Sequence, residues 1–340
     1  MLGREQTVVL LWLRIVPHTN RDQEKLGVAL GHLMAHDGSL AVKSGADGAV
    51  MIGAPSEDQL EAIVTELVRR FGVAAAVKSL EIAYKETLTR AADGESEYAV
   101  PLGGRGQYAH VKLRVEPGEP GSGCVFDFRK AILGDAIPER MISSVEEGIA
   151  EAIYCGVLSG YPIDDIRLAV YDGSYDDVAS SEAAFKIAGR LAFIDAARRA
   201  KPILLEPIMT VSVMIPHHHE SRVMDGLRAR GAGFQSFGEE DAEHSMMTIS
   251  TLVPLSRMFG YGAELTAQSW GHGTFSMAFS HYAPAILSED DGDRAADVTA
   301  PLRPRTPPLI LRAAVPEPPD DRAEGLTAYL SRVWSCDLSR

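Results

Sequence analysis

A glycine-rich segment in the middle of the chain has residue types suited to contacting phosphates or another chain. Residues 103–108 read Gly-Gly-Arg-Gly-Gln-Tyr, and an alternating strand follows at 108–115. Glycines allow close backbone approach, while Arg105 and Gln107 offer planar hydrogen-bond donors. On pattern alone a tight hairpin with an exposed arginine is the favoured interpretation, because glycine marks turns so often. Phosphate contact is the functional alternative.

This segment lacks the spacing of a nucleotide-binding phosphate loop. Such a loop needs Gly-x-x-x-x-Gly-Lys-Ser/Thr, and that pattern occurs nowhere in the 340 residues. We therefore expect no GTP hydrolysis by this chain, no catalytic residues and no bound cofactor.

Three other groups of reactive side chains favour ordinary structural roles. Residues 217–220 read His-His-His-Glu, but consecutive residues cannot all face one ion, so we expect a solvated helix start and no metal site. Cys124, Cys155 and Cys336 are far apart and odd in number, which argues against disulfides and zinc. We expect Cys124 and Cys155 to be buried thiols.

Two acidic pairs and one tryptophan are also candidates. The pairs 164–165 and 176–177 are both Asp-Asp, and we expect solvated loop carboxylates, not catalytic acids. Trp270, which precedes Gly-His-Gly, is equally consistent with stacking on an RNA base and with covering the edge of a core.

The composition limits the possible partners. The chain has 33 Lys and Arg against 47 Asp and Glu, for a net charge of −14. This balance disfavours indiscriminate nucleic-acid binding, which requires many neutralised phosphates, so we expect no DNA partner. No apolar run approaches the ~18 residues that cross a bilayer, so we expect no membrane partner. The scattered cysteines favour a reducing cytoplasm.

The elements that must position these residues fall into three folded segments. The first 85 residues follow the order strand, helix, strand, strand, helix, strand, with Asn20 and Ser56 as the expected helix caps. The same order recurs at 204–283, with helices at 219–229 and 256–265. Both segments therefore predict the βαββαβ order of a ferredoxin-like domain.

The segment between them has a different order. Strands are expected at 108–115, 124–128 and 166–171, and helices at 138–158 and 181–201. From 287 to 340 an acidic opening and a proline-rich stretch predict a linker, followed by a short helix at 321–334. The apolar face of the 181–201 helix is expected to be Phe185, Ile187, Ala188, Leu191, Ala192 and Ile194.

Several motifs resemble, in order, the C-terminal half of elongation factor G. The glycine-rich segment, followed by His110-Val111, resembles one signature of that family's fourth domain, and residues 173–186 resemble a second. The resemblance covers about residues 5–283 and does not include the GTPase domain or domain II. Further matches are Asp22 to Leu26, Gly160 to Pro162, Lys201-Pro202, Leu204 to Met209, Val253 to Ser256 and Met258 to Tyr261.

The resemblance implies an α+β fold, in which two ferredoxin-like domains (1–85 and 203–286) flank an elongated ribosomal-protein-like α/β domain (86–202). It implies a non-catalytic protein that binds the ribosome, with the tip loops of the middle domain contacting rRNA, and tRNA as a further partner, near the decoding region. The implied contact residues are Gly103, Gly104, Arg105, Gly106, Gln107, Tyr108, Gly173, Ser174, Tyr175 and Asp176.

The chain also departs from the family pattern. Asp176 stands where the family usually has histidine, and a carboxylate repels RNA phosphates. Residues 86–200 hold 12 Lys and Arg against 19 Asp and Glu. Residues 54–57 read Ala-Pro-Ser-Glu in place of Gly-Met-Gly-Glu, and His272 replaces an arginine.

Three alternatives remain open. The first is half of a split GTPase whose G domain is a separate polypeptide. The second is a ribosome-protection protein, and the third is a diverged paralogue with a protein partner. The Gly-Gly-Arg-Gly-Gln pattern favours elongation factor G over the protection proteins, while the acidity and Asp176 favour the diverged paralogue.

Overall fold

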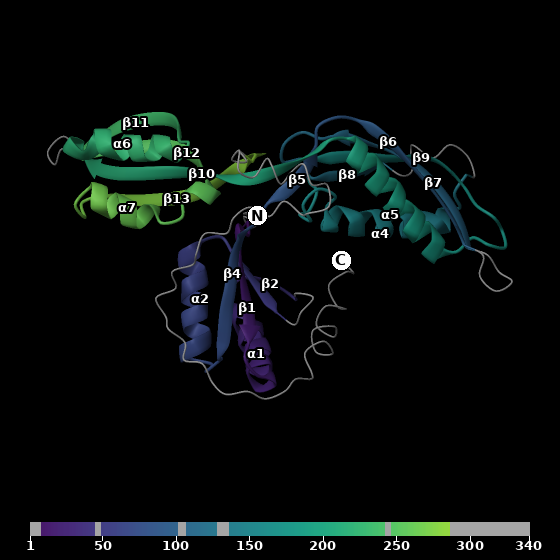
Figure 1. Cartoon of the computed structure of the whole chain (residues 1–340), viewed down its shortest axis with the longest axis horizontal. Coiled ribbons are helices and arrows are strands. Elements are labelled where there is room, and N and C mark those ends of the chain that lie inside the picture. Colours follow the sequence, from purple (N-terminus) through teal and green to yellow (C-terminus); the bar gives the residue numbers. More distant parts are fainter. Residues whose placement is uncertain (1–7, 45–48, 101–106, 128–135, 242–245, 286–340) are drawn as a thin grey trace, which may run out of the picture. The chain divides into compact units, whose positions relative to one another are not determined.

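A computed structural model describes residues 8–44, 49–100, 107–127, 136–241 and 246–285 (Figure 1). These residues form two compact units that divide between Ala83 and Tyr84. Within the described residues, no helix combines the length and apolar character needed to cross a lipid bilayer.

The first unit is a four-stranded antiparallel sheet with two helices. Its elements are β1 (Leu11–Pro17), α1 (Asn20–His36), β2 (Ala41–Ser44), β3 (Val50–Ala54), α2 (Glu57–Arg69) and β4 (Ala75–Ile82). The strand order β2-β3-β1-β4 is that of a ferredoxin-like fold. Ser56 caps α2 as expected, but Thr19, not Asn20, caps α1 by accepting a hydrogen bond from the Asp22 backbone.

The second unit contains a sheet with the same topology. Its elements are β10 (Pro202–Pro216), α6 (Glu220–Ala229), β11 (Gly233–Asp241), β12 (Met246–Pro254), α7 (Tyr261–Gln268) and β13 (Thr274–Pro284). The order β11-β12-β10-β13 repeats that of the first unit, and β5 (Lys85–Leu88) adds to β10. The helix expected at 256–265 is instead a 3₁₀ turn (Leu255–Arg257) and α7, because Gly260 lies between them in the left-handed conformation.

The rest of the second unit is a sheet with two long helices. Its strands are β6 (Ala92–Val100), β7 (Gln107–Pro117), β8 (Cys124–Asp127) and β9 (Ile166–Ser174), in the order β6-β7-β9-β8. The helices are α4 (Glu139–Cys155) and α5 (Glu182–Arg199). Strand β8 runs parallel to β9, and α4 connects them. The α+β fold, with its ferredoxin-like and domain IV-type parts, is thereby confirmed.

Small residues allow the two long helices to approach closely. A Cβ atom added at Gly148 would lie 2.0 Å from the Lys186 carbonyl oxygen, and one at Gly189 would lie 2.9 Å from Val145. The buried face of α5 agrees with the predicted one at Phe185, Ala188 and Ala192, while Leu191 is 45% exposed and Ile187 and Ile194 are half-buried. The buried residues of α5 are Ala184, Phe185, Ala188, Gly189, Ala192, Phe193, Ala196 and Ala197.

Candidate functional site

The adjoining ends of β7 and β9 bring two sequence-predicted site segments together. The two strands are antiparallel, with His110 opposite Ser174 and Val111 opposite Gly173. The hydroxyl oxygens of Tyr108 and Ser174 lie 2.7 Å apart. The Tyr108 backbone donates to the Ala179 carbonyl at 3.0 Å. The start of β7 is therefore joined to the segment 174–180 by a side-chain and a backbone hydrogen bond. Residues 103–106 lie outside the described residues.

The segment 174–180 is a closed loop held by its own polar groups. One carboxylate oxygen of Asp176 accepts hydrogen bonds from the backbone of Ala179 at 2.8 Å and of Val178 at 2.9 Å. The Asp176 backbone donates to the Ser180 hydroxyl, and that hydroxyl donates to the Tyr108 carbonyl. The bonds from Ala179 and Val178 lower the pKa of Asp176 below its usual 3.8. Asp176 thus organises the loop, a role that the sequence comparison with histidine did not reveal.

Gly173 is required by packing where β9 enters this loop. A Cβ atom there would lie 2.5 Å from the His110 carbonyl oxygen and 2.7 Å from Ile137. Ile137 is 3% exposed and directly precedes α4, so the start of that helix lies beside the loop. This glycine therefore serves the local packing, whatever the loop contacts.

A serine, a histidine and a carboxylate line up across β9, β7 and β6. His110 Nδ1 lies 3.2 Å from Ser174 Oγ, and His110 Nε2 lies 2.7 Å from Glu95 Oε1. The order of residue types resembles a hydrolytic triad. The geometry does not support a nucleophile, because Ser174 already bonds to Tyr108 and Glu95 is 59% exposed to solvent. The histidine instead couples the loop to the sheet.

The open face of the sheet carries paired charges. Lys112 lies 3.6 Å from Glu95 and 3.4 Å from Asp172, while Arg114 lies 2.8 Å from Glu116 and 3.2 Å from Asp93. The bond to Asp172 and the charge of Glu95 raise the pKa of Lys112. On α5, Lys186 lies between Glu147 and Glu151 at 2.8 and 2.7 Å. These cations are matched by carboxylates, so these surfaces do not form a phosphate-binding patch.

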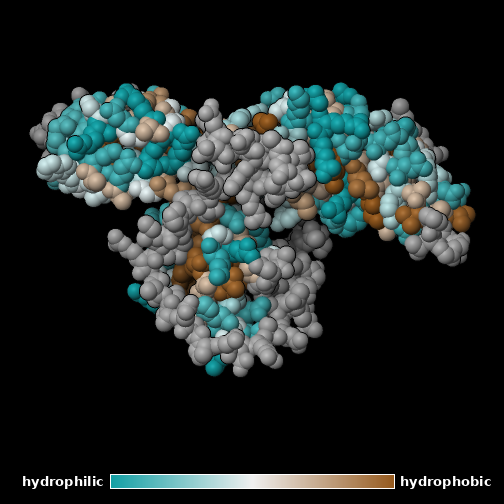
Figure 2. All heavy atoms as spheres, in the orientation of Figure 1, coloured by the Kyte–Doolittle hydropathy of each residue, from teal (hydrophilic) through white to brown (hydrophobic). Residues whose placement is uncertain are grey.

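The loop itself presents exposed apolar and aromatic groups. Val178 is 79% exposed and Tyr175 is 38% exposed. In Figure 2, hydrophobic residues, shown in brown, are visible on the surface of this domain at its end away from β10. We define the tip surface as Gln107, Tyr108, Ser174, Tyr175 and Val178. Stacking and hydrogen bonding are the interactions that these groups offer.

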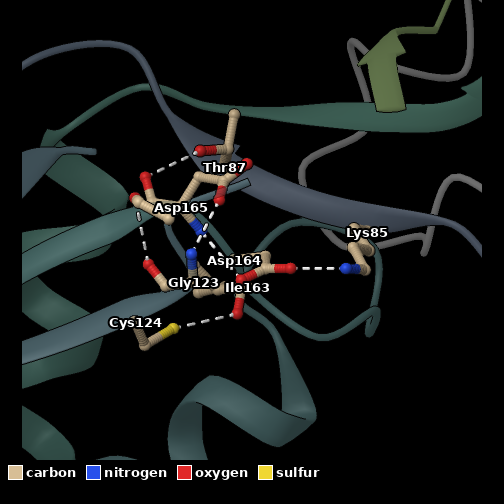
Figure 3. Close-up of polar contacts among 8 residues, drawn as sticks. Lys85, Thr87, Gly123, Cys124, Ile163, Asp164 and Asp165 are labelled. Carbon is tan, nitrogen blue, oxygen red and sulfur yellow. Dashed lines mark hydrogen bonds and ion pairs between the residues drawn. The ribbon is translucent and has the colours of Figure 1, made fainter. Parts of the chain in front are cut away.

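A second polar cluster connects β5 with the loop before β9 (Figure 3). Lys85 forms an ion pair with Asp164, and Asp165 accepts from the Gly123 backbone at 3.0 Å. The Thr87 hydroxyl donates to the Asp165 carbonyl at 3.5 Å. These aspartates are loop carboxylates, as expected, but they are only partly solvated and join three chain segments. No proton-transfer role follows from their positions.

Next to this cluster, Glu86 is a fully buried carboxylate. Its two oxygens accept four backbone hydrogen bonds from residues 157, 158, 159 and 161, at 2.7–3.1 Å. A Cβ atom at Gly156 would lie 2.7 Å from the same carboxylate. Glu86 therefore ties β5 to the loop after α4. Sequence reasoning missed it, because a single glutamate in a polar stretch carries no distinguishing pattern.

The cysteines and histidines show no reactive centre among the described residues. Cys124 is half-buried, and burial together with Asp164 and Asp165 raises the pKa of its thiol to about 11. Cys155 is exposed, so its predicted burial is wrong. The part of the chain that the structure describes contains no group of three or more potential metal ligands. Burial of the ring and the neighbouring His218 and His272 lower the pKa of His219.

Trp270 does not cover a core. It is 77% exposed, with a positive φ of 56°. Trp270 was expected either to stack on an RNA base or to cover the edge of a core. Its exposure shows that the second interpretation is wrong. An exposed indole remains available for stacking, although the structure shows no partner for it among the described residues.

Comparison with known families assigns the two parts of the second unit. Residues 80–201 match the model for elongation factor G, domain IV, and residues 203–291 match the model for the elongation factor G C-terminus. A crystal structure of a protein from Thermus thermophilus is similar, with 32% sequence identity and a TM-score of 0.66. The match covers 87% of this chain but only 44% of the Thermus chain, so this chain spans less than half of that protein's length.

Proposed function

Because the chain is a relative of the C-terminal half of elongation factor G, with its domain IV and its C-terminal domain, we propose that it binds the ribosome without performing chemistry. The family assignment makes it a translation-factor-like protein. The observation that carries the proposal is the tip surface, in which the start of β7 is bonded to the end of β9 and to the loop that carries the exposed Tyr175 and Val178. This surface can bind through shape, stacking and hydrogen bonds. We expect rRNA to be its partner, with tRNA as a further partner.

The charge distribution also supports a local contact. Electrostatic attachment along the sheet face would need cations that are not already paired, and Lys112 and Arg114 are both held by carboxylates. A protein with a net charge of −14 approaches RNA against repulsion. The tip surface must therefore supply directional contacts, and the binding should depend less on salt than the binding of a basic protein. A ribosome-binding role implies that the protein acts in the cytoplasm, which we include in the proposal.

Co-sedimentation with 70S ribosomes at low and moderate salt tests the proposal. We expect the full chain to pellet with ribosomes at both salt concentrations. The variant Tyr175→Ala removes an aromatic group from the tip surface and should reduce the pelleted fraction several-fold, since base stacking contributes ~1–3 kcal/mol per base. Arg105→Ala with Gln107→Ala tests the adjoining glycine-rich segment.

Tyr154→Ala is the matched control. Tyr154 is 63% exposed and lies at the last turn of α4, whereas the first turn of that helix lies beside the tip. The helix has 17 residues, which separates its two ends by about 24 Å. This variant should pellet like the natural chain. If the natural chain stays in the supernatant at both salt concentrations, ribosome binding is wrong.

One observation favours a second candidate function, half of a split GTPase. The similar Thermus chain is more than twice as long as the region matched here. A separate polypeptide with a phosphate loop would then complete the factor. GTP turnover that appears only when the two chains are mixed on ribosomes would support this candidate, and unchanged turnover on mixing would reject it.

A further inference from the structure

We propose that the C-terminal segment around residues 326–334 docks into a groove between α1 and α2 of the first unit. The groove has a volume of about 390 Å³ and lies on the helices of the ferredoxin-like domain. Its apolar lining includes Leu33, Leu40, Ala62 and Ile63. This inference concerns a different unit from the tip surface and does not depend on ribosome binding.

Four polar side chains that line the groove, those of Asp37, Gln59, Glu66 and Arg70, are already bonded to one another or to Ser39. Asp37 accepts hydrogen bonds from Ser39 and from the Gln59 side chain at 2.7 Å. Glu66 pairs with Arg70 at 2.6 Å. Groups that are satisfied in this way have little to offer a small polar ligand, which is bound through a few convergent polar contacts. The remaining feature is the apolar floor, and an apolar occupant fits it.

Two histidines form one wall of the groove. His32 and His36 stack with ring centroids 4.5 Å apart and planes inclined by 16°. His36 Nδ1 lies 2.8 Å from the His32 carbonyl oxygen, which can only accept, so that nitrogen carries a proton. Both rings line the groove together with the aliphatic side chains of its floor. Imidazole rings and aliphatic side chains together form a surface suited to an amphipathic helix.

The sequence beyond the described residues contains one segment with the matching pattern. Its apolar residues are Leu326, Tyr329, Leu330, Val333 and Trp334. Their spacing of i, i+3, i+4, i+7 and i+8 places them on one face of a helix. Polar residues, including Ser331 and Arg332, fall on the other face. Helices of this kind bind grooves through the same i, i+3, i+4 and i+7 positions.

The connecting chain is long enough for docking within one molecule. Forty residues separate Ala285, the last described residue, from Leu326. A chain of 40 residues has a fully extended reach of about 130 Å. Because the segment and the groove belong to the same polypeptide, docking does not require the entropic cost of bringing two molecules together.

Hydrogen–deuterium exchange of the full chain tests the docking. In the natural chain we expect the amides of residues 326–334 to exchange at least tenfold more slowly than an unstructured peptide of the same sequence. Ala62→Glu places a charge in the groove at an exposed helical position and should abolish this protection. Leu330→Asp with Trp334→Asp should abolish it as well, and should speed exchange along the groove-lining part of α2.

Two controls separate docking from general effects of substitution. Thr65→Glu makes a charge change at another exposed position of α2, outside the groove, and should preserve the protection. Arg332→Ala alters the polar face of the segment and should also preserve it. Unprotected residues 326–334 in the natural chain, or protection that survives Ala62→Glu, would overturn the proposal. Protection that disappears on hundredfold dilution would show that the segment docks onto a second copy, which also overturns it.

Discussion

The hydroxyl groups of Tyr108 and Ser174, 2.7 Å apart, join the first residues of β7 to the last residue of β9. Both residues belong to segments that the sequence linked to one functional surface, although they are 66 positions apart. His110 adds a contact of 3.2 Å to the same serine. The hydroxyl pair therefore sits at the centre of a small network that fixes one tip segment against the other.

The network should show measurable coupling in a double-mutant cycle. Tyr108→Phe and Ser174→Ala each remove one hydroxyl with little change in shape. We expect each to lower the free energy of unfolding by about 0.5–1.5 kcal/mol, and the double variant to lose less than the sum. Urea unfolding of the four proteins measures this. Strictly additive losses would show that the two hydroxyls do not interact in solution.

Asp176 predicts a pH-dependent loop. Its pKa is lowered in the folded protein, so its stabilising contribution is present above the unfolded value near 3.8 and is lost as the pH falls through the lower folded value. The amide resonances of Val178 and Ala179, whose N–H groups bond to this carboxylate, should therefore titrate together below pH 4. Their chemical shifts measured against pH test this expectation, and invariant shifts between pH 5 and 2 would contradict it.

Substitutions at the same position separate loop geometry from charge. Asp176→Asn retains an oxygen that accepts both backbone bonds but removes the negative charge, whereas Asp176→Ala loses both. If the tip meets RNA phosphates, the asparagine variant should bind ribosomes more tightly than the natural chain. The alanine variant should bind less tightly than the asparagine variant, because its loop is no longer held. Equal binding by both variants would exclude a role for the loop geometry.

Glu86 should be one of the least replaceable side chains in the second unit. It is fully buried and accepts four backbone hydrogen bonds. Glu86→Gln puts an amide donor where only N–H groups face it, so at least one donor is left without an acceptor. We expect a loss of about 2–4 kcal/mol in the free energy of unfolding. The control Glu97→Gln, at an exposed position of β6, should change it by less than about 0.5 kcal/mol.

The order of the ferredoxin-like elements followed from the sequence because their apolar periodicity is regular. Two strands of the second unit, β5 and β6, were missed. Strand β6 carries Asp93, Glu95 and Glu97 on its exposed positions and Gly94 at its buried one, so it lacks the alternating apolar residues of a half-buried strand. Pairing with β7 over nine residues, which is not visible in the local sequence, makes it a strand.

The candidate site was predictable in part. The glycine-rich segment and residues 173–176 were identified from motifs, and the structure brings Tyr108 and Ser174 together. The role of Asp176 in its own loop was not predictable, because it depends on where the Val178 and Ala179 amides point. The hydrogen bonds of Glu86 were hidden for the same reason. The identity of an acceptor side chain does not show which backbone N–H groups it will contact in the folded protein.

The predicted face of α5 was right for Phe185, Ala188 and Ala192 and wrong for Leu191, because small volume as well as hydrophobicity selects what lies between α4 and α5. Gly148 illustrates the constraint, since an added Cβ atom would lie 2.0 Å from the Lys186 carbonyl oxygen. A backbone atom cannot move aside as a flexible side chain can, so Gly148→Ala must push the helices apart. We expect a loss of about 1–3 kcal/mol in the free energy of unfolding of the second unit, despite the higher helix propensity of alanine.

Gly31→Ala provides the opposite case with the same chemical change. Gly31 lies within α1, is exposed, and has no atom within 4 Å of an added Cβ. Alanine should therefore stabilise the first unit by about 0.5–1 kcal/mol through helix propensity alone. Thermal unfolding of both variants, with each unit followed by a local probe, would show one transition moving down and the other moving up. If Gly148→Ala instead raised the transition of the second unit, close contact of the α4 and α5 backbones would be wrong.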